Sequence, residues 1–249
     1  MNPKPEKSYR DYFIRDGIHV GDYEGMYRDC EDPWRIEELG IRLDMRAALL
    51  LLKAYPPEAG GPGGELRALD AGAGAGLFSL ALFRALAEGF GRVELALNDV
   101  SPTALSKAEE RFRAAGAPLP ALVPYDLRLL VGHPAGGVSH GPGGAPSPPL
   151  ASWPFAPGSL DLVVLAQSLW GVVLELDGVL CAFRRLLAPG GALLVSQHFP
   201  GEARQLFGRE VTGPEDFSRH LRRAGFALLA ELETDRASNH HWGAMWRSI

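Results

Sequence analysis

The stretch Leu69-Asp70-Ala71-Gly72-Ala73-Gly74-Ala75-Gly76-Leu77-Phe78 decides the fold, because an acidic residue is followed by three glycines at alternate positions. The residues just before the glycines, Arg67 to Leu69, are typical of the end of a buried strand, and Leu77 to Leu86 are typical of a helix that is apolar on most faces. Glycines at such a turn permit backbone angles that a side chain would forbid, and they let a ligand approach the helix N-terminus. The sequence therefore predicts a strand-to-helix turn that binds a nucleotide-like molecule.

The spacing of the glycines distinguishes this turn from a dinucleotide-binding fingerprint, which has the form G-x-G-x-x-G. Here Gly72, Gly74 and Gly76 follow Asp70 as Asp-x-Gly-x-Gly-x-Gly. This form resembles motif I of the class I S-adenosylmethionine-dependent methyltransferases. The resemblance implies S-adenosylmethionine as a co-substrate and these four residues as part of its binding site.

Length and charge limit the partners of the chain. Its 249 residues, 46% of them hydrophobic, suffice for one well-buried domain with a small lid but not for two catalytic domains. The 25 basic and 30 acidic residues give a formal net charge of −5, and no basic run is interleaved with aromatics. We therefore expect a small-molecule substrate and no nucleic acid. The oligomeric state is left open.

The cysteines and the N-terminal residues predict a cytoplasmic protein. Cys30 and Cys181 have no metal-ligand spacing, so we expect neither a metal site nor a disulfide. The first residues, MNPKPEKSYRDYF, lack the apolar core of a signal peptide. No stretch approaches the roughly 18 consecutive apolar residues of a membrane span.

Residues 1–35 are predicted to form an N-terminal helical lid rich in aromatic side chains. Aromatic faces attract cations such as a sulfonium or an amine, although such residues more often anchor a short helix pair to its domain. We name Tyr23 and Tyr27 as candidate catalytic residues and Tyr12 and Trp34 as candidate substrate-binding residues. The fragment YRDCEDPW within this segment resembles the segment before motif I in methyltransferases similar to the nodulation N-methyltransferases.

Residues 36–249 are predicted to form the S-adenosylmethionine-binding domain, beginning with an amphipathic helix from Ile36 to Tyr55. After the glycine-rich turn, Val93 to Leu97 predict a second strand that leads to Asp99. A carboxylate at the end of this strand suits the two hydroxyls of a ribose. The alternative is an N-cap or turn role for Asp99 at the start of the helix that follows, and it is compatible with the ribose role. We count the neighbouring Val100 as cofactor-binding as well.

A third strand, Leu122 to Tyr125, is followed by Asp126, at the position where the resembled family places an acidic residue near the adenine amino group. Many strands end in Asp for reasons of turn geometry alone. A Gly- and Pro-rich insertion at about residues 128–152 departs from the family pattern. We expect it to be a mobile loop whose His133 and His140 are solvated rather than metal ligands.

The segment from Trp153 to Val164 resembles the Pro-Phe and Ser-Phe-Asp-Leu-Val segment of the same family and predicts a strand from Leu160 to Leu165. Ligands of open α/β sheets bind at the carboxyl ends of the strands, near the switch point. We therefore name Gln167 as a cofactor-binding residue and Ser168 and Trp170 as substrate-binding residues.

A helix predicted from Asp177 to Leu187 leads through Ala-Pro-Gly-Gly into a strand from Ala192 to Gln197. This join is highly similar to the Leu-x-Pro-Gly-Gly turn of the resembled methyltransferases. His198 follows the strand and is a candidate general base, because the pKa of histidine lies near working pH. A lone histidine at a strand end is more often structural or exposed.

The chain closes with a predicted helix, Gly213 to Gly225, and two strands, Phe226 to Glu233 and Asn239 to Arg247. The alternation of strands and helices predicts an α/β fold with helices on both faces of a doubly wound sheet. The resemblance narrows it to the mostly parallel seven-stranded sheet of the class I methyltransferase type, with an antiparallel last strand.

Three functions follow from the resemblance. The first is an S-adenosylmethionine-dependent methyltransferase that acts on a small metabolite in the biosynthesis of a specialised product. The second is a cyclase similar to the azetidine-2-carboxylate synthases, which release methylthioadenosine from S-adenosylmethionine. The third is a non-catalytic S-adenosylmethionine-binding protein. No residue pattern separates them, because function lies in the site rather than in the fold.

Overall fold

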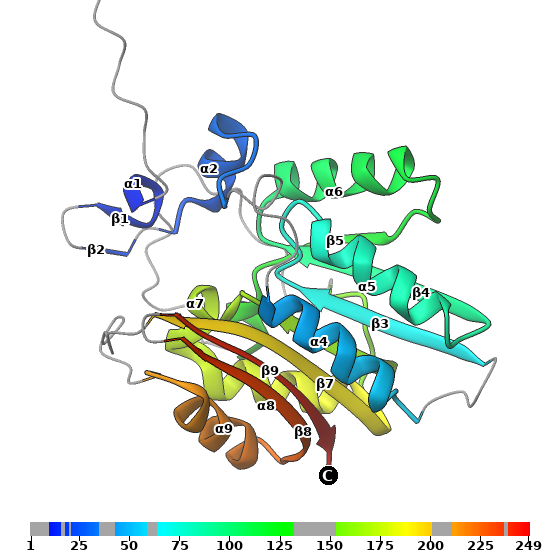
Figure 1. The fold of residues 1–249 in the computed structure, drawn as a ribbon. Coiled ribbons are helices and arrows are strands. Elements are labelled where there is room, and N and C mark those ends of the chain that lie inside the picture. Colours follow the sequence, from blue (N-terminus) through cyan, green and yellow to red (C-terminus); the bar gives the residue numbers. More distant parts are fainter. Residues whose placement is uncertain are drawn as a thin grey trace, which may run out of the picture.

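The computed structural model describes residues 10–15, 18–19, 21–34, 43–58, 64–131, 153–200, 211–236 and 239–249. Within them, a seven-stranded sheet has helices on both faces (Figure 1). Its strand order is β5-β4-β3-β6-β7-β9-β8. The strands are β3 (Glu65–Ala71), β4 (Arg92–Asp99), β5 (Ala121–Pro124), β6 (Leu160–Ala166), β7 (Leu187–Pro200), β8 (Phe226–Arg236) and β9 (Asn239–Ser248).

The first five strands of this sheet are parallel, and β9 runs antiparallel to both β7 and β8. The predicted fold class and the antiparallel last strand are therefore confirmed. The order reverses at β3, since β4 pairs with one edge of it and β6 with the other. The crevice at the carboxyl ends of β3 and β6 is the switch point at which such sheets bind ligands.

Two helical layers bury the two faces of the sheet. One face is covered by α4 (Leu43–Ala54), α5 (Leu77–Ala87) and α6 (Pro102–Ala114). The other is covered by α7 (Leu169–Val172), α8 (Leu176–Leu186) and α9 (Pro214–Arg223), together with the 3-10 helices η1 (Leu127–Val131) and η3 (Val173–Glu175). Central strands such as β6, buried along their whole length, are uniformly apolar in sequence except for Asp161.

The N-terminal residues form a small unit beyond the carboxyl ends of the central strands, with α2 next to α6 (Figure 1). It contains α1 (Arg10–Phe13) and α2 (Tyr23–Asp29), and between them a two-stranded ribbon of β1 (Ile14–Arg15) and β2 (Ile18–His19). The ribbon was not predicted, because two-residue strands carry no detectable alternation of apolar and polar residues.

Most strand limits differ from the predicted ones by a residue or two, and the strands β7 and β8 differ by more. The strand β7 begins at Leu187 rather than Ala192, because the Pro-Gly-Gly join continues it: Leu160 pairs with Leu187 and Leu162 with Ala192, which leaves a bulge around Gly190. Gly190 has a φ of +78°, which glycine adopts without strain. The strand β8 extends to Arg236, three residues past the predicted end, because β9 pairs with it to that point.

Several predictions concern residues outside the described ones. The helix predicted from Ile36 is described from Leu43 only, and the domain limit at residues 35 and 36 stays a prediction. His133, His140 and most of the predicted insertion also lie outside the described residues.

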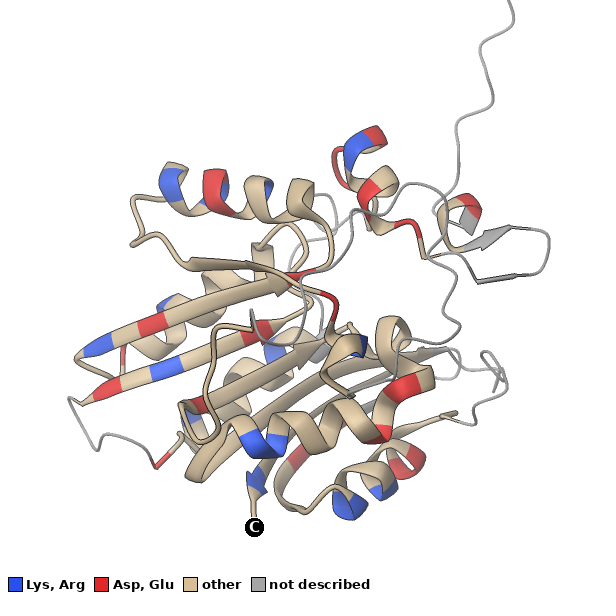
Figure 2. Cartoon of the chain, turned by 180° about the vertical axis from the view of Figure 1, so that it is seen from behind, with Lys and Arg blue, Asp and Glu red and all other residues tan. Residues whose placement is uncertain are grey.

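The described part of the chain can be searched for membrane-spanning helices and for clusters of charge. None of its helices combines the length and apolarity needed to cross a membrane. Acidic and basic residues are interspersed along the outer helices rather than gathered by sign (Figure 2).

Gly76 is required by the packing of α5 against α6, and we predict that Gly76→Ala destabilises the protein. A Cβ at Gly76 would lie 2.6 Å from the Cβ of Ala108, and the backbone φ is +76°. We expect the free energy of unfolding to fall by about 3 kcal/mol in a denaturant titration, from left-handed strain and the clash together. Gly116→Ala is the matched control, since φ is +64° there and nothing lies within 4 Å. It should cost about 1 kcal/mol. Equal losses in the two variants would contradict the packing explanation.

Candidate functional site

A cavity of about 660 Å³ lies at the carboxyl ends of the central strands. Its floor comes from the glycine-rich turn after β3 and from the ends of β4 and β5, one wall from β6 and α7, and its cover from α2 and residues 31–34. A cavity of this size falls within the range of small-molecule sites. The site therefore lies where the sheet topology predicts it.

The glycine-rich turn is held by backbone hydrogen bonds and close neighbours. The N–H groups of Gly72 and Ala73 both donate to the carbonyl oxygen of Asn98, at 2.9 and 2.8 Å. All three glycines have positive φ. A Cβ at Gly72 would collide with the Ser168 hydroxyl, and one at Gly74 would lie 2.5 Å from the Tyr27 hydroxyl oxygen. These contacts require glycine even before a ligand is considered.

Asp99 connects this turn to the start of α6. Its carboxylate accepts hydrogen bonds from the N–H groups of Gly74 and Ser101, both at 2.9 Å. Burial raises the pKa of Asp99 to about 6 despite these hydrogen bonds. The helix cap is Ser101, whose hydroxyl accepts from the N–H of Ala104. Asp99 is therefore not the N-cap, whereas its hydrogen bond from the Ser101 N–H, two residues further on, gives it the alternative turn role.

Asp70 is the second buried carboxylate of the cavity floor. Its Oδ2 accepts a hydrogen bond from the Ser79 hydroxyl at 2.7 Å, whereas Oδ1 has no hydrogen-bond partner in the described part of the chain. Burial raises the pKa of Asp70 to about 6, and the nearby charge of Asp99 adds to the shift. An unpaired buried oxygen of this kind favours a ligand that brings a donor or a positive charge.

Asp126 lines the cavity, but its carboxylate is engaged by Arg128. The Nε of Arg128 lies 2.9 Å from Oδ1 of Asp126, and Nη2 lies 2.6 Å from Oδ2. The N–H of Arg128 also donates to Oδ1, at 3.0 Å. A contact between Asp126 and an adenine amino group stays a prediction, and any such contact would share the carboxylate with Arg128.

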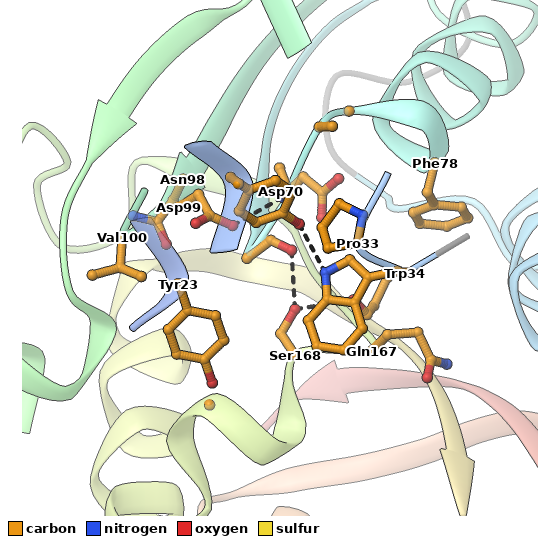
Figure 3. A pocket seen from close by; sticks show the side chains of 18 of the residues that line it. Tyr23, Pro33, Trp34, Asp70, Phe78, Asn98, Asp99, Val100, Gln167 and Ser168 are labelled. Atoms are coloured by element: carbon orange, nitrogen blue, oxygen red, sulfur yellow. Dashed lines mark hydrogen bonds between the residues drawn. The ribbon is translucent and has the colours of Figure 1, made fainter. Parts of the chain in front are cut away.

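The cover of the cavity is a set of packed aromatic rings. Trp34 donates from Nε1 to the Tyr27 hydroxyl at 3.0 Å, and the Trp34 ring stacks on Phe13 with a centroid distance of 5.4 Å. The ring of Phe13 meets Tyr23 edge to face at 4.9 Å. Figure 3 shows Tyr23 and Trp34 together with the strand-end side chains of Asp70 and Asp99.

Burial affects the two candidate catalytic tyrosines. It raises the pKa of Tyr27 and of Tyr23 far above the ordinary value of 10.0, with Asp99 contributing to both shifts and Arg128 opposing that of Tyr23. Both hydroxyls therefore stay protonated at neutral pH, and neither acts as a phenolate base. Each can still donate or accept a hydrogen bond, so a catalytic contribution of that kind stays a prediction.

Helix α2 is anchored to the N-terminus of α6 by Glu24. Its carboxylate accepts hydrogen bonds from the hydroxyls of Ser101 and Thr103, at 2.6 and 2.5 Å, and from the N–H of Thr103. Burial opposes ionisation of Glu24, but these hydrogen bonds outweigh it and lower the pKa. Lys107 donates to the carbonyls of residues 30 and 31 and holds the other end of the helix.

Tyr12 is not among the residues that line the cavity. It is buried in the cluster that joins α1 to α2, and its hydroxyl donates to Asp29 at 3.0 Å. These contacts give Tyr12 an anchoring position away from the cavity wall, and a substrate-binding role for it stays an untested prediction. Sequence alone did not separate Tyr12 from the other aromatics, because only the fold determines which rings face the cavity.

The wall from β6 and α7 contains the remaining predicted residues. The Ser168 hydroxyl lies within hydrogen-bond distance of the carbonyls of Gly72 and Ala166, and Trp170 packs edge to face on Phe199. Gln167 has a φ of +58°, an uncommon value for a residue other than glycine.

Gln167 also positions the backbone of His198, whose N–H donates to Oε1 of Gln167 at 3.2 Å. The ring of His198 lies beside that of His241, with centroids 4.9 Å apart. His198 lines the cavity, which a general base must do, while its catalytic role stays a prediction.

The structure brings together every predicted site residue except Tyr12. Those that line the cavity are Tyr23, Tyr27, Trp34, Asp70, Gly72, Gly74, Gly76, Asp99, Val100, Asp126, Gln167, Ser168, Trp170 and His198. Their binding and catalytic roles stay predictions. Among the described residues, no group of three His, Cys, Asp or Glu side chains is arranged to hold a metal ion.

Sequence reasoning missed Phe13, Asn98, Arg111 and Arg128, which also line the cavity. The side-chain amide of Asn98 donates to the carbonyls of Val123 and Tyr125 and thereby fixes the end of β5. Arg111 donates to the carbonyl of Ala75. Asn98 stands directly before Asp99 and Arg128 two residues after Asp126, so both could have been noticed, whereas nothing near Arg111 signals a site.

Of the comparisons with known proteins, the one with solved structures gives matches, and these agree on the fold. No protein-family model matches the sequence, and no curated protein matches it significantly. Among solved structures, the N-methyltransferase NodS from Bradyrhizobium japonicum WM9 with S-adenosylhomocysteine has a TM-score of 0.58 at 20% identity, over 91% of this chain and 97% of that one.

Two further structures are similar. The magnesium protoporphyrin IX methyltransferase ChlM from Synechocystis PCC 6803, with bound S-adenosylhomocysteine, has a TM-score of 0.57 at 17% identity, over 96% of this chain and 97% of that one. The (4+2)-cyclase SpnF has a TM-score of 0.56 at 16% identity, over 85% and 96%. The chain has the fold of the class I S-adenosylmethionine-dependent methyltransferases.

The raised pKa of Asp70 predicts a pH-dependent contribution to stability. A carboxyl whose pKa is about 6 in the folded protein and 3.8 when unfolded favours folding while protonated, and this contribution is lost as pH rises from about 4 to 6. We expect the free energy of unfolding of the wild type, relative to Asp70→Asn, to fall by roughly 2 kcal/mol between pH 4 and 6.5 in urea titrations. A difference that does not change with pH would contradict the buried, ionisable state of Asp70.

Proposed function

We propose that this protein is an S-adenosylmethionine-dependent methyltransferase that methylates a small metabolite in the biosynthesis of a specialised product. The observation that carries the proposal is the pair of buried carboxylates, Asp70 and Asp99, on adjacent strand ends beside the glycine-rich turn. S-adenosylmethionine has a ribose diol, a sulfonium and an ammonium group. Its donors and positive charges fit two buried carboxylates, one of which has an unpaired oxygen.

Each part of the ligand has candidate partners in the cavity. We assign the ribose hydroxyls to Asp99, which keeps acceptor capacity beyond its backbone hydrogen bonds. Val100, 39% exposed, and Asp126 would flank the adenine. The glycine-rich turn and Asp70 would hold the methionyl part, and Gln167 would adjoin it from the opposite wall.

The protein has little covalent chemistry to perform, because the sulfonium makes the attached methyl carbon electrophilic. The residues of this chain would hold the nucleophile in line and exclude water. Ser168 and Trp170 would shape the acceptor pocket with Trp34. We assign His198 the role of general base and Tyr23 and Tyr27 the role of protonated hydrogen-bonding partners.

The structural neighbours support this proposal at the level of the fold. NodS and ChlM are methyltransferases whose structures contain S-adenosylhomocysteine. We further propose a cytoplasmic location, which the two free cysteines, Cys30 and Cys181, favour. A nucleic-acid partner is not part of the proposal.

A cyclase is the alternative, and the position of Tyr27 favours it. The Tyr27 hydroxyl lies directly over Gly74, so the cover approaches the glycine-rich turn closely. In an azetidine-2-carboxylate synthase the amino nitrogen of S-adenosylmethionine, after losing a proton to a base, attacks Cγ of the same molecule. A C–N bond forms, the C–S bond breaks and methylthioadenosine leaves. The neighbour SpnF is itself named a cyclase.

Product analysis separates these functions. The protein is incubated with S-adenosylmethionine, with and without a cell extract as the source of acceptors, and the nucleosides are identified by mass spectrometry beside an enzyme-free control. We expect S-adenosylhomocysteine only when the extract is present. An amount of methylthioadenosine above that in the control would contradict methyl transfer and support the cyclase. Tight binding without either product would favour a non-catalytic binding protein.

The carboxylates provide a second test. Asp99→Ala and Asp70→Ala should each weaken S-adenosylhomocysteine binding at least 10-fold in calorimetric titrations, since a hydrogen bond to a charged group contributes about 1.5–3 kcal/mol. Glu65→Ala is the matched control, because Glu65 is an exposed carboxylate at the other end of β3. Unchanged affinity in both aspartate variants would refute the site.

A further inference from the structure

Arg128 is a cavity-lining cation whose position is fixed by Asp126. It lies in the first turn of η1, and its guanidinium binds both oxygens of the Asp126 carboxylate through Nε and Nη2. The same carboxylate accepts the N–H of Arg128, so side chain and backbone are held by one group. A guanidinium restrained in this way loses little entropy on binding a ligand.

The guanidinium keeps free donors. Nε and one N–H of Nη2 serve Asp126, while Nη1 has no hydrogen-bond partner in the part of the chain that the structure describes. Glu175 is close enough to favour the charged form of Arg128, but no hydrogen bond joins the two among the described residues. Arg128 is about one-third exposed, and it lines the cavity.

Apart from the carboxylates of Asp126 and Glu175, the neighbours of Arg128 are apolar or neutral. The helix η1 packs on α8, where Val131 lies against Gly178, so Arg128 belongs to the face of the sheet that α7 covers. Across this part of the cavity, the Tyr23 hydroxyl lies against Gly171 of α7. Burial raises the pKa of Tyr23, and the charge of Arg128 is close enough to oppose that rise. A charge-assisted hydrogen bond is stronger in such surroundings than in water.

Arg111 also lines the cavity, but its side chain hydrogen-bonds to the backbone. Arg111 donates from Nε to the carbonyl of Ala75 and supports the glycine-rich turn. Asp70 and Asp99 would repel an anion at the floor, so an anionic group is favoured only near Arg128.

We propose that Arg128, held by Asp126, binds the carboxylate of a small molecule, so that the cavity selects a carboxylic acid. The planar guanidinium suits a carboxylate, which it binds through two parallel N–H donors. This inference rests on the proposed function, because it names the chemical class of the acceptor in the same cavity. The carboxylate is that of the acceptor, because the methionyl part of the co-substrate is assigned to the glycine-rich turn and Asp70, whereas Arg128 is held beside Asp126.

The first arm tests the acceptor. Wild type and Arg128→Gln, both saturated with S-adenosylhomocysteine, are titrated calorimetrically with benzoate, phenylacetate and hexanoate and with the matching amides. We expect the wild type to bind at least one acid 10-fold or more tightly than its amide. Arg128→Gln should abolish that preference and leave the affinity for the amide within twofold. Arg128→Lys keeps the positive charge but lacks the planar guanidinium, so this variant should retain part of the preference for acids over amides.

The second arm tests the co-substrate. S-adenosylhomocysteine has the methionyl carboxylate, whereas methylthioadenosine lacks it. A 10-fold loss of affinity for S-adenosylhomocysteine in Arg128→Gln, with unchanged methylthioadenosine binding, would assign the carboxylate to the co-substrate and overturn the proposal that it belongs to the acceptor. Equal losses for both nucleosides, or no carboxylate-specific change in either arm, would overturn it.

Controls separate this inference from folding and from the proposed function. Glu175→Gln removes the neighbouring carboxylate and should leave the preference for acids intact or increase it. Thermal unfolding establishes that each variant is folded, and Arg128→Lys replaces Arg128→Gln in both arms if the latter is not. If the wild type bound neither nucleoside, the proposed function would fail. The titrations with acids and amides, repeated without nucleoside, would then still decide whether Arg128 binds carboxylates.

Discussion

The hydrogen bonds that bind Asp99 to the N–H groups of Gly74 and Ser101 are the interaction on which the rest of the site depends. They join the glycine-rich turn after β3 to the start of α6, so two separate loops have one fixed arrangement. The arrangement keeps a carboxylate buried although burial disfavours its charge. Backbone donors that are held by regular elements on both sides stabilise the charged form of such a group.

The cover of the cavity is attached to the same interaction. Ser101 donates its hydroxyl to Glu24 of α2 and its N–H to Asp99, and Tyr27, one turn after Glu24, places its hydroxyl over Gly74. Helix α2 thus contacts both groups that hold Asp99. Only Gly74 and Ser101, which both donate to Asp99, lie between its carboxylate and helix α2. The lid is better described as a docked helix whose aromatic rings complete the cavity wall.

Sequence reasoning predicted the elements whose signals are local. The glycine spacing predicted the turn, and the apolar strands with their short connections predicted the sheet, because backbone angles and burial leave direct traces in residue type. Sequence reasoning failed where the contacts of a side chain are determined by the folded structure rather than by neighbouring residues in the sequence. Tyr12 bonds to Asp29 instead of facing the cavity, and Arg128 takes the carboxylate of Asp126. The extra length of β7 likewise depends on β6 and β9, the strands that pair with it.

The charges of the cavity divide it into two parts with different preferences. Asp70 and Asp99 make the floor beside the glycine-rich turn acidic, and their raised pKa values show that an unneutralised charge there is costly. A cationic ligand would offset that cost, so the floor is suited to the positive charges of the proposed co-substrate. On the side of η1, Arg128 is paired with Asp126 through Nε and Nη2, and the rest of its guanidinium offers hydrogen-bond donors to the cavity. A cation at the floor would in turn attract an anion to these donors. The two parts of the cavity therefore favour opposite charges, and binding at one strengthens binding at the other by ordinary electrostatics.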